Sequence, residues 1–518
     1  MNLSLLASFL ASHTSTPARI AAAKAALRTP AGPMLRQELG RWVVATLPAE
    51  TVVPEIYAAW RPLVRDSMLF MITHLSAARL APKLVEQAEL PHSTTPEQRL
   101  LRLIARVPGL QKIGQVLARN RHFHPSLRRA LSELENGIAD VTPSQIRAVI
   151  QKQLGRRLAA YAVEIDPELI AEASVSAVMG FSWRNPETQR RERGVFKVLK
   201  PYVSACFTED LELLQQLAHS LAETHPEYGR ALPDTIMEVR ALLEHEVDFV
   251  REQATLAEAA KAYRSLRGVR VPRLFRPLST PTITALSEEN GVKVTDALAD
   301  ASPRQRRGAA EQLIEALVGV PLFARAGRSI FHADPHAGNL LYDARTGQLV
   351  LLDWALTESL TRDQRRHVAL MALMLGLRDP VGLCGEIEAL ALDRPLDPAS
   401  TGFIRDHVNR FIGELPIRRL PGSVDAMRLL DRIALAGVRF PSGLMMFRKV
   451  LFMLDGILHD IAAPNMRMDL ALARQFLARW TNSPLSLFDW IGVEASALLY
   501  AGRLWVQWAE AALHGAEA

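Results

Sequence analysis

The chain has 518 residues, of which 49% are hydrophobic and 22% are charged. This composition excludes an intrinsically disordered chain, and the length exceeds what one compact core usually holds, so we expect two or three packed units. A net charge of +6, without a dense Lys/Arg stripe interleaved with aromatic residues, disfavours nucleic acid as a partner.

Residues 1–34 form an N-terminal segment whose apolar start has no basic residue ahead of it, unlike a secretory signal peptide. Arg19, Lys24 and Arg28 follow later, so an organelle transit peptide is an alternative. We favour a short helix that runs up to Pro30. The only cysteines, Cys206 and Cys384, are far apart and outside any CxxC pair, which excludes a disulfide framework and indicates a reducing compartment.

Residues 35–155 have apolar positions three and four apart, with breaks at prolines, which predicts an all-helical extension. In residues 156–290 the pattern changes to strands. A strand-like run from about Leu169, the turn-rich stretch SWRNPETQRRERG and the apolar run from Val195 to Leu199 predict a β-hairpin with a charged tip. Further strands are expected at Val269 to Val271 and at Thr282 to Leu286.

Between these strands, the segment from Phe207 to Tyr263 has a helical pattern. It places Glu246 and Glu252 on one long helix, where six residues correspond to a rotation of about 240°. The two carboxylates therefore point to different sides, with Asp248 between them in sequence. We expect one helix to serve two separate contacts.

Residues 291–480 turn helical from about Ser302. Strands early and helices late predict an α+β fold, with a small α/β lobe followed by a larger helical lobe. Residues 481–518 predict a C-terminal amphipathic helix, from Leu485 to His514, that carries three tryptophans. Its charge-free run is far below the roughly 20 residues that span a bilayer. Packing on the helical lobe, lying in a membrane interface and forming a dimer contact all remain open for this helix.

The motif that carries chemistry lies between Ser329 and Asp353 and reads SIFHADPHAGNLLYDARTGQLVLLD. Asp334 and Asn339 stand in a D-x-x-x-x-N frame, and an apolar strand then leads to Asp353. This is the spacing of a kinase catalytic loop, in which the first aspartate orients or deprotonates the attacking hydroxyl and the other two side chains bind Mg²⁺. Hard oxygen ligands suit the Mg²⁺ that must accompany ATP phosphates. The motif therefore predicts ATP and Mg²⁺ as cofactors.

Two other interpretations of this motif exist. Asp334 and Asn339 could cap backbone amides in a polar turn without any catalytic role. His332, Asp334 and His336 alternate in sequence and would share a face of a strand, which suits the metal ligands of a zinc hydrolase. Pro335 disfavours a regular strand there, and no further ligands stand out.

A lysine that grips phosphate is expected on a strand of the small lobe, and Lys197 in GVFKVLKP is the candidate. Strand alternation puts Lys200 on the opposite side, just before Pro201 ends the strand. A partly buried Lys197 needs an acidic partner, for which we predict Glu252. A plain surface lysine is the alternative.

From Val107 to Asp460 the chain resembles the UbiB family of atypical kinases, also called the ADCK family. KIGQ, from Lys112 through Gly114 to Gln115, resembles the KxGQ signature of that family's helical extension. Glu246-Val247-Asp248 resembles its ExD signature, and Glu252 stands at the position of its helix-C glutamate. HADPHAGN and the LLD that ends at Asp353 complete the set.

This resemblance implies a bilobal kinase-like fold in which the extension covers the substrate cleft. It implies an alanine-rich loop over the phosphates, with Ala171, Ala173 and Ser174 as contacts, and a gating role for the KxGQ and ExD residues. It further implies ATP hydrolysis, or phosphorylation of a small-molecule or lipid acceptor such as a quinone precursor. The family is linked to ubiquinone biosynthesis and other isoprenoid-lipid metabolism, which implies a cytoplasmic protein peripheral to a membrane.

The chain departs from the family pattern at several positions. Glu172 interrupts the alanine-rich loop, where a carboxylate would repel triphosphate unless it points away or contacts Mg²⁺. Trp354 follows Asp353 where kinases have phenylalanine, and Thr255 replaces a family asparagine. Ala177 and Ser287 also differ from the residues expected. A nucleotide-binding pseudokinase scaffold of a membrane-associated biosynthetic complex is therefore an alternative. A small-molecule phosphotransferase is another, because HADPHAGN followed by LLDW also resembles the active site of aminoglycoside kinases.

Overall fold

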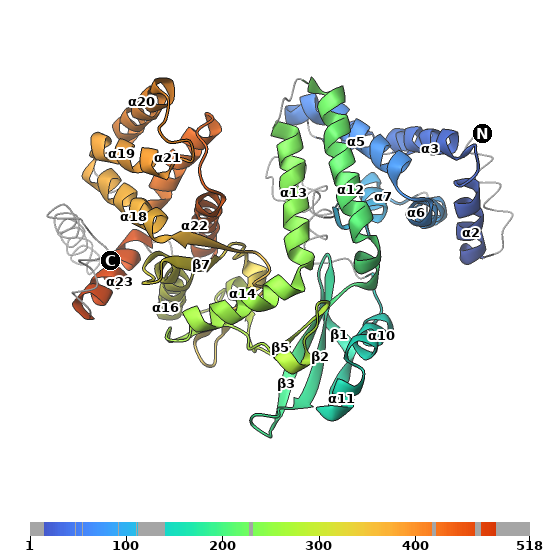
Figure 1. Ribbon diagram of the computed structural model, residues 1–518, viewed down its shortest axis with the longest axis horizontal. Helices are drawn as coiled ribbons and strands as arrows, with labels where there is room; N and C mark the ends of the chain where they lie inside the picture. The colour runs from blue at the N-terminus through green and yellow to red at the C-terminus, as the bar shows by residue number, and fades with distance from the viewer. Residues whose placement is uncertain are drawn as a thin grey trace. The chain divides into compact units, whose positions relative to one another are not determined.

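The computed structural model describes residues 15–46, 48–53, 55–91, 93–109, 111, 140–226, 231–416, 421–461 and 468–482. The chain divides into two compact units (Figure 1). The first unit comprises Met1–Phe249 and Phe275–Ser287, and the second comprises Val250–Leu274 and Glu288–Ala518. The expected C-terminal helix and the KIGQ segment lie outside the described residues.

The N-terminal part of the first unit is helical wherever it is described, as the apolar spacing predicted. Its helices bury one continuous apolar core, to which Leu39, Leu80 and Val107 contribute along with Leu213 and Leu243 from later in the chain. The helices are α2 (Thr16–Ala26), α3 (Gly32–Thr46), α4 (Ala49–Val52), η1 (Glu55–Trp60), α5 (Arg61–His74), α6 (Ala77–Glu89), α7 (Pro96–Ile104), α12 (Pro201–Thr224) and α13 (Ala231–Val247).

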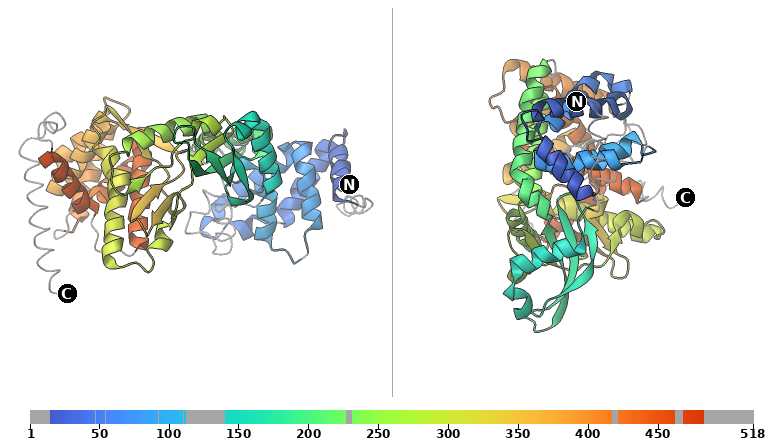
Figure 2. Two further views of the ribbon diagram at one scale, coloured as in Figure 1. Left: turned by 90° about the horizontal axis from the view of Figure 1, so that it is seen from below. Right: turned by 90° about the vertical axis from the view of Figure 1, so that its right-hand side faces the viewer.

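A four-stranded antiparallel sheet forms the rest of the first unit, in the order β1-β2-β3-β5. One face packs on α10 and α11 (Figures 1 and 2), with Phe196 and Val198 meeting Ile146 and Ile150 in a buried core. The strands are β1 (Glu164–Glu172), β2 (Ser176–Arg184), β3 (Arg191–Leu199) and β5 (Ile283–Ser287), and the helices are α10 (Pro143–Leu154) and α11 (Arg156–Ala160), with η3 (Arg276–Leu278) beside β5.

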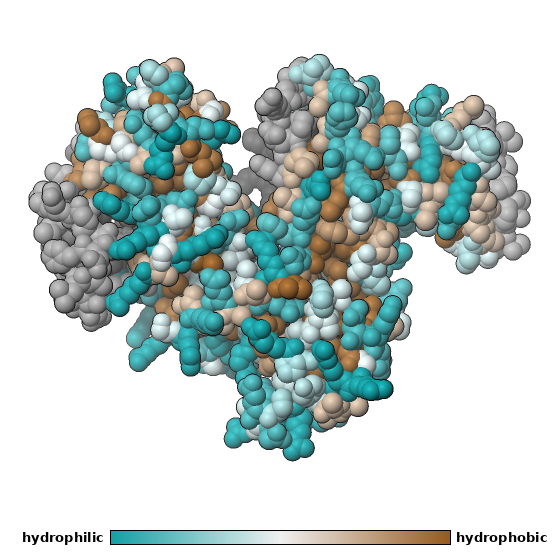
Figure 3. All heavy atoms as spheres, viewed as in Figure 1, coloured by the Kyte–Doolittle hydropathy of each residue, from teal (hydrophilic) through white to brown (hydrophobic). Residues whose placement is uncertain are grey.

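The predicted hairpin is confirmed as β2 and β3. Asn185 N donates to Arg190 O across the turn, and the tip is covered by hydrophilic side chains at the lower end of Figure 3. The sequence pattern did not resolve β1 as a separate strand, because Pro167 interrupts it and its register with β2 is irregular. Five of its nine residues face solvent and none is fully buried, so no apolar alternation marks it.

The stretch from Phe207 to Tyr263 is mainly helical where it is described, as predicted, but the one long helix expected to carry both Glu246 and Glu252 is wrong. Breaks divide this stretch into α12, α13 and α14 (Phe249–Ala262), and α13 ends at Val247, just before Asp248. Asp competes for backbone hydrogen bonds and favours helix ends over helix interiors, which apolar spacing alone does not reveal. As a result Glu246 and Glu252 lie on different helices and in different compact units.

The second unit places small sheets beside a set of helices. One sheet has the order β4-β9-β8-β6, and β7 pairs with β10 in another. The strands are β4 (Val269–Arg270), β6 (Val292–Lys293), β7 (Arg328–His332), β8 (Leu340–Asp343), β9 (Gln348–Leu351) and β10 (Thr357–Thr361).

Helices α18 to α21 of this unit are stacked in sequence (Figure 1), and α16 begins after Ser302, whose side chain accepts from Gln305 N. The helices of the unit, besides α14, are α15 (Val294–Ala297), α16 (Pro303–Ile314), the π-helical turn η4 (Glu315–Gly319), α17 (Val320–Leu322), η5 (Ala337–Asn339), α18 (Arg362–Leu377), α19 (Pro380–Leu390), α20 (Pro398–Glu414), α21 (Ser423–Leu435), α22 (Ser442–Asp460) and α23 (Met468–Asn482).

These elements confirm the α+β class, with a small sheet-containing part followed by a mainly helical part. The strands expected near Val269 and Thr282 are present as β4 and β5. Within the described ranges, no helix has the length and apolarity that crossing a membrane requires. Cys206 and Cys384 are both free thiols.

Candidate functional site

The loop that carries Asp334 is held by a buried histidine. His332 ends β7 and has no exposed surface, and its Nε2 lies 2.7 Å from the carbonyl oxygen of Leu352. The backbone N–H of Asp334 donates to His332 Nδ1 at 3.2 Å. Burial lowers the pKa of His332 below its ordinary value of 6.5, so the ring is neutral and carries its proton on Nε2. Both ring nitrogens are engaged within the protein, which disfavours His332 as a metal ligand.

Asn339 lies at the other end of the same loop. Its side-chain nitrogen donates to the Asp334 carbonyl at 3.1 Å, and its own carbonyl accepts from Leu352 N at 2.8 Å. Because the amide nitrogen is used to close the loop, the amide oxygen is the atom that can face a cation. Asn339 is thus fixed both to the catalytic-loop aspartate and to the strand that leads to Asp353.

Asp353 follows β9 in a left-handed backbone conformation, with φ of 51°. Aspartate tolerates this region better than most residues, yet left-handed non-glycine residues carry strain that concentrates at functional sites. Its Oδ1 accepts from Ala355 N at 3.2 Å, and the residue is exposed. The next residue, Trp354, is fully buried and donates from Nε1 to Leu351 O at 3.1 Å. The turn therefore exposes the carboxylate and anchors the indole in the core.

Asp334, Asn339 and Asp353 are therefore brought together, as their sequence spacing suggested. One amide oxygen and one carboxylate are a small ligand set, but Mg²⁺ in nucleotide sites is held by one or two carboxylates together with phosphates and waters. These residues fit such an ion. In the described part of the chain, no group of three or more His, Cys, Asp or Glu side chains could hold a metal, which gives the zinc-hydrolase alternative no support.

Helix α14 packs against the segment that follows Asp353. Thr255 Oγ1 donates to the Trp354 carbonyl at 2.9 Å, and the Tyr263 ring meets the Trp354 indole at 5.5 Å between centroids. Glu252 lies one turn before Thr255 on this helix and is only 3% exposed. The threonine that replaces the family asparagine thus ties the helix carrying Glu252 to the Asp353 turn.

Lys197 lies in the middle of β3, opposite Val178 and Thr284. Its neighbours Phe196 and Val198 are fully buried on the α10 side, so alternation directs Lys197 to the other face of the sheet, where it is half-buried. Its ammonium lies 5.5 Å from the ring centroid of Phe249. Lys197 and Glu252 belong to different compact units, and their pairing stays a prediction.

The alanine-rich loop is the turn between β1 and β2. Ala171 is exposed near the end of β1, and Ala173 N donates to Ser176 O at 2.8 Å to close the turn. Ser174 Oγ lies 3.4 Å from Glu246 Oε2, so the first residue of the ExD sequence contacts this loop. Asp248 is exposed. The predicted gating residues Lys112, Gly114 and Gln115 lie outside the described residues.

A buried ionic cluster, formed by Lys200, Asp140, Glu172 and Tyr202, lies beneath this loop. The ammonium of Lys200, whose side chain is 1% exposed, is 2.8 Å from Asp140 Oδ1 and 3.1 Å from Glu172 Oε2. Tyr202 Oη donates to Asp140 Oδ2 at 2.9 Å. Glu172 is therefore paired with a lysine, which removes the repulsion that its sequence position suggested.

Lys200 lies just beyond β3, which ends at Leu199, and caps the N-terminus of α12, so it is not the strand residue that alternation predicted. Sequence reasoning also missed both of its acidic partners. Asp140 is distant in the chain and follows a segment of helical pattern, where nothing marks it as a partner. It also missed Lys449 on α22, whose Nζ lies 2.9 Å from Asp334 Oδ1. A lysine in a helical sequence pattern is usually exposed to solvent, so no local sequence signal indicated the contact between Lys449 and Asp334.

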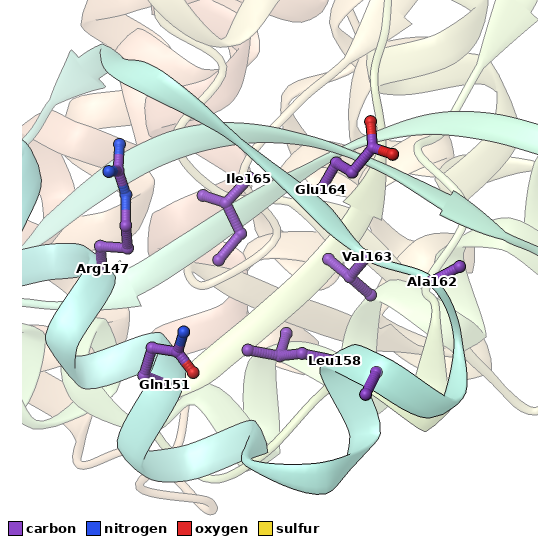
Figure 4. A pocket seen from close by; sticks show the side chains of 8 residues that line it. Arg147, Gln151, Leu158, Ala162, Val163, Glu164 and Ile165 are labelled. Atoms are coloured by element: carbon purple, nitrogen blue, oxygen red, sulfur yellow. The ribbon is translucent and has the colours of Figure 1, made fainter.

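An open cavity of about 400 Å³ lies on the α10 side of the first-unit sheet (Figure 4). Arg147, Gln151 and Leu158 line it from α10 and α11, and Val163 to Ile165 line it from the start of β1. Lys197 faces away from α10, so this cavity is separate from the candidate nucleotide-binding residues.

Comparison with known proteins defines the class. The ABC1 atypical kinase-like domain matches residues 133–383, which include Lys197, Glu252, Asp334, Asn339 and Asp353. The protein is therefore an atypical kinase-like protein. At about 25% identity over most of the chain to proteins described as probable protein kinase UbiB, it is a divergent member of the UbiB/ADCK family.

One of these relatives, from Azotobacter vinelandii, is 26% identical over 427 residues, covering 77% of this chain and 75% of its own. Another, from Pseudomonas putida, is 25% identical over 410 residues, covering 76% and 72%. An uncharacterized protein of Synechocystis is 27% identical over 282 residues, covering 54% of this chain and less than half, 46%, of its own length.

A solved structure, the complex of Rv3197 with erythromycin from Mycobacterium tuberculosis, is similar over 68% of this chain and 87% of that chain. The sequence identity is 18% and the TM-score is 0.45.

Proposed function

We propose that this protein is a Mg-ATP-dependent enzyme of the UbiB type, which hydrolyses ATP or transfers its terminal phosphoryl group to a small-molecule or lipid acceptor. The observation that supports this most is the turn at Asp353. A strained left-handed aspartate is exposed there. The preceding residue, Leu352, accepts from His332 Nε2 with its carbonyl and donates from its N–H to the Asn339 carbonyl, which ties the strand end to the loop.

Each candidate residue has a distinct role in this proposal. Asn339 and Asp353 hold Mg²⁺, which neutralises charge on the phosphates, and Asp334 orients the attacking hydroxyl or water. Lys197 binds phosphate, and Glu252 orients Lys197. Ala171, Ala173 and Ser174 cover the phosphates, and the gating residues of the cleft are Lys112, Gly114, Gln115, Glu246 and Asp248.

The test is Mg-dependent release of phosphate from ATP by the purified full chain and by Asp353→Asn. Loss of a carboxylate ligand costs several kcal/mol of transition-state stabilisation, so we expect turnover to fall by about 10³-fold or more. Asp300→Asn, at an exposed aspartate in a turn of the same unit, is the matched control and keeps full turnover. Unchanged turnover in the Asp353 variant overturns the assignment.

A nucleotide-binding pseudokinase scaffold is the second candidate, motivated by Trp354 after the metal-binding aspartate. Protein that binds Mg-ATP but releases no phosphate, with or without anionic liposomes, favours it. Turnover that requires an added hydroxylated small molecule favours instead the phosphotransferase that resembles aminoglycoside kinases.

We further propose a cytoplasmic location at a membrane surface, in support of ubiquinone or related isoprenoid-lipid metabolism. Flotation with anionic liposomes, comparing the full chain with one ending at Pro484, tests the membrane contact. Weaker flotation of the shorter chain assigns that contact to the C-terminal segment, whereas equal flotation excludes the segment from this role. Sedimentation of the same two chains tests the alternative dimer contact.

A further inference from the structure

Helix α22 is placed against the catalytic loop by two close packing contacts. The Phe447 ring meets Phe331 of β7 edge to face, at 5.3 Å between centroids and 76° between planes. At Gly443 an added Cβ would lie only 2.5 Å from the carbonyl oxygen of Ser359 on β10, so the helix approaches the backbone of that strand closely. Phe331 comes three residues before Asp334 and Phe447 two residues before Lys449, so this packing brings Lys449 to the loop.

The resulting ion pair joins Lys449 Nζ to Asp334 Oδ1 at 2.9 Å. The two side chains are 32% and 20% exposed, and partly exposed pairs of this kind contribute little to folding stability. Asp334 also holds the loop through its main chain: the N–H donates to His332 Nδ1, and the carbonyl accepts from the Asn339 side chain and from His336 N. These contacts fix where the residue lies, and they do not fix how its carboxylate is turned.

We infer that Lys449 is a positioning residue for Asp334, and that it turns the carboxylate so that the second oxygen, Oδ2, can face the attacking hydroxyl or water. His336, two residues later in the same loop, places its Nε2 3.9 Å from that oxygen. Orientation of a catalytic group is worth a large rate factor, because a displacement of about 1 Å can cost about 10²-fold. The inference rests on the proposed function and adds to it a residue from a helix outside the kinase motifs.

The test compares Lys449→Met with Lys449→Arg in the full chain, with Mg-ATP as substrate and phosphate release as the readout. We expect Lys449→Met to lower kcat by about 10- to 10²-fold and to leave the Kd for Mg-ATP within about twofold, because Lys449 does not contact the proposed metal ligands. Lys449→Arg keeps the charge and restores most of the kcat. A purely structural role would not produce this split between kcat and Kd together with rescue by arginine.

The matched control is Arg448→Met, at the neighbouring position of α22, where the side chain pairs with Asp431 instead. It removes an ion pair from the same helix and keeps kcat. In a variant that already carries Asp334→Asn, adding Lys449→Met is expected to change the residual kcat by less than about twofold. If Lys449 acts only through Asp334, the effects of the two substitutions are not additive.

Two results overturn the inference: an unchanged kcat in Lys449→Met, or a full additional loss of kcat in the double variant. Absence of phosphate release by the unmodified protein is a different failure, because it overturns the proposed function on which the inference rests.

Discussion

Polar groups hold the two candidate functional loops of this protein, and they do so by different means. In the first unit, the buried ionic cluster holds the alanine-rich loop through charge, with Lys200 between Asp140 and Glu172. In the second unit, neutral His332 holds the loop that carries Asp334 through two hydrogen bonds to main-chain atoms. Removing one member of a buried ionic cluster leaves charge uncompensated, whereas removing a neutral anchor costs only hydrogen bonds. The free energy of unfolding should therefore fall further when Lys200 is replaced than when His332 is replaced.

The sharpest test of this comparison is Lys200→Met. It leaves two carboxylates together in a nearly dry site, with Asp140 4% and Glu172 11% exposed, and we expect the free energy of unfolding to fall by about 3–5 kcal/mol. Urea denaturation measures this. Recovery of stability in the triple variant that adds Asp140→Asn and Glu172→Gln would confirm charge as the cause. A loss below about 1 kcal/mol for Lys200→Met would contradict the assignment.

Lys197→Met, three residues earlier and within β3, should lower activity and leave stability nearly unchanged. Lys197 is half-buried on the other face of the sheet, so we expect the free energy of unfolding to change by less than about 1 kcal/mol. Loss of a phosphate-binding charge should lower ATP turnover by about 10²-fold, equivalent to about 2.7 kcal/mol. Steady-state phosphate release, corrected for the folded fraction, measures this. Equal stability losses in the two lysine variants would remove the distinction between them.

His332→Phe tests the neutral anchor. The ring contact with Trp354 is kept and both hydrogen bonds are lost, which should cost about 1–3 kcal/mol of unfolding free energy at pH 7.5. Burial lowers the pKa of His332 below 6.5 in the folded protein, so the unfolded chain binds more protons between that lowered pKa and 6.5. The contribution of neutral His332 to the free energy of unfolding is therefore fully present above pH 6.5, and it declines as the pH falls below 6.5.

The difference in unfolding free energy between the unmodified protein and His332→Phe should therefore shrink from pH 7.5 to pH 5.5. Urea denaturation at both pH values measures it. A difference that grows towards low pH would mean that His332 is charged in the folded protein.

The smallest effect is expected for Thr255→Val, which removes the hydrogen bond from α14 to the Trp354 carbonyl at nearly constant volume. We expect a loss of about 1 kcal/mol in the free energy of unfolding. Thr255→Asn, which introduces the residue that the family resemblance suggests, is the companion variant. A loss above about 3 kcal/mol for Thr255→Val would show that this contact belongs to a wider buried network.

Local signals were sufficient for part of this structure. The β2–β3 hairpin follows from its polar turn and flanking apolar runs, and the Asp334, Asn339 and Asp353 grouping follows from motif spacing, because these residues are close in sequence. The break at Asp248 was missed because apolar spacing continues across it. Contacts between distant segments could not be predicted from local sequence patterns. Asp140 and Lys200 are 60 residues apart in the chain, and Lys449 and Asp334 are 115 residues apart. Such pairs are set by how helices pack on strands, which no single pattern encodes.

The position of Asp140 has one more consequence. This residue lies in the helical extension just before α10, and its main-chain N–H donates to Glu172 while its carboxylate accepts from Lys200 and Tyr202. The alanine-rich loop and the extension therefore share one set of bonds. If a ligand of the loop shifts the extension through these bonds, thermodynamic reciprocity requires that a shift of the extension changes the affinity of the loop for that ligand by the same factor.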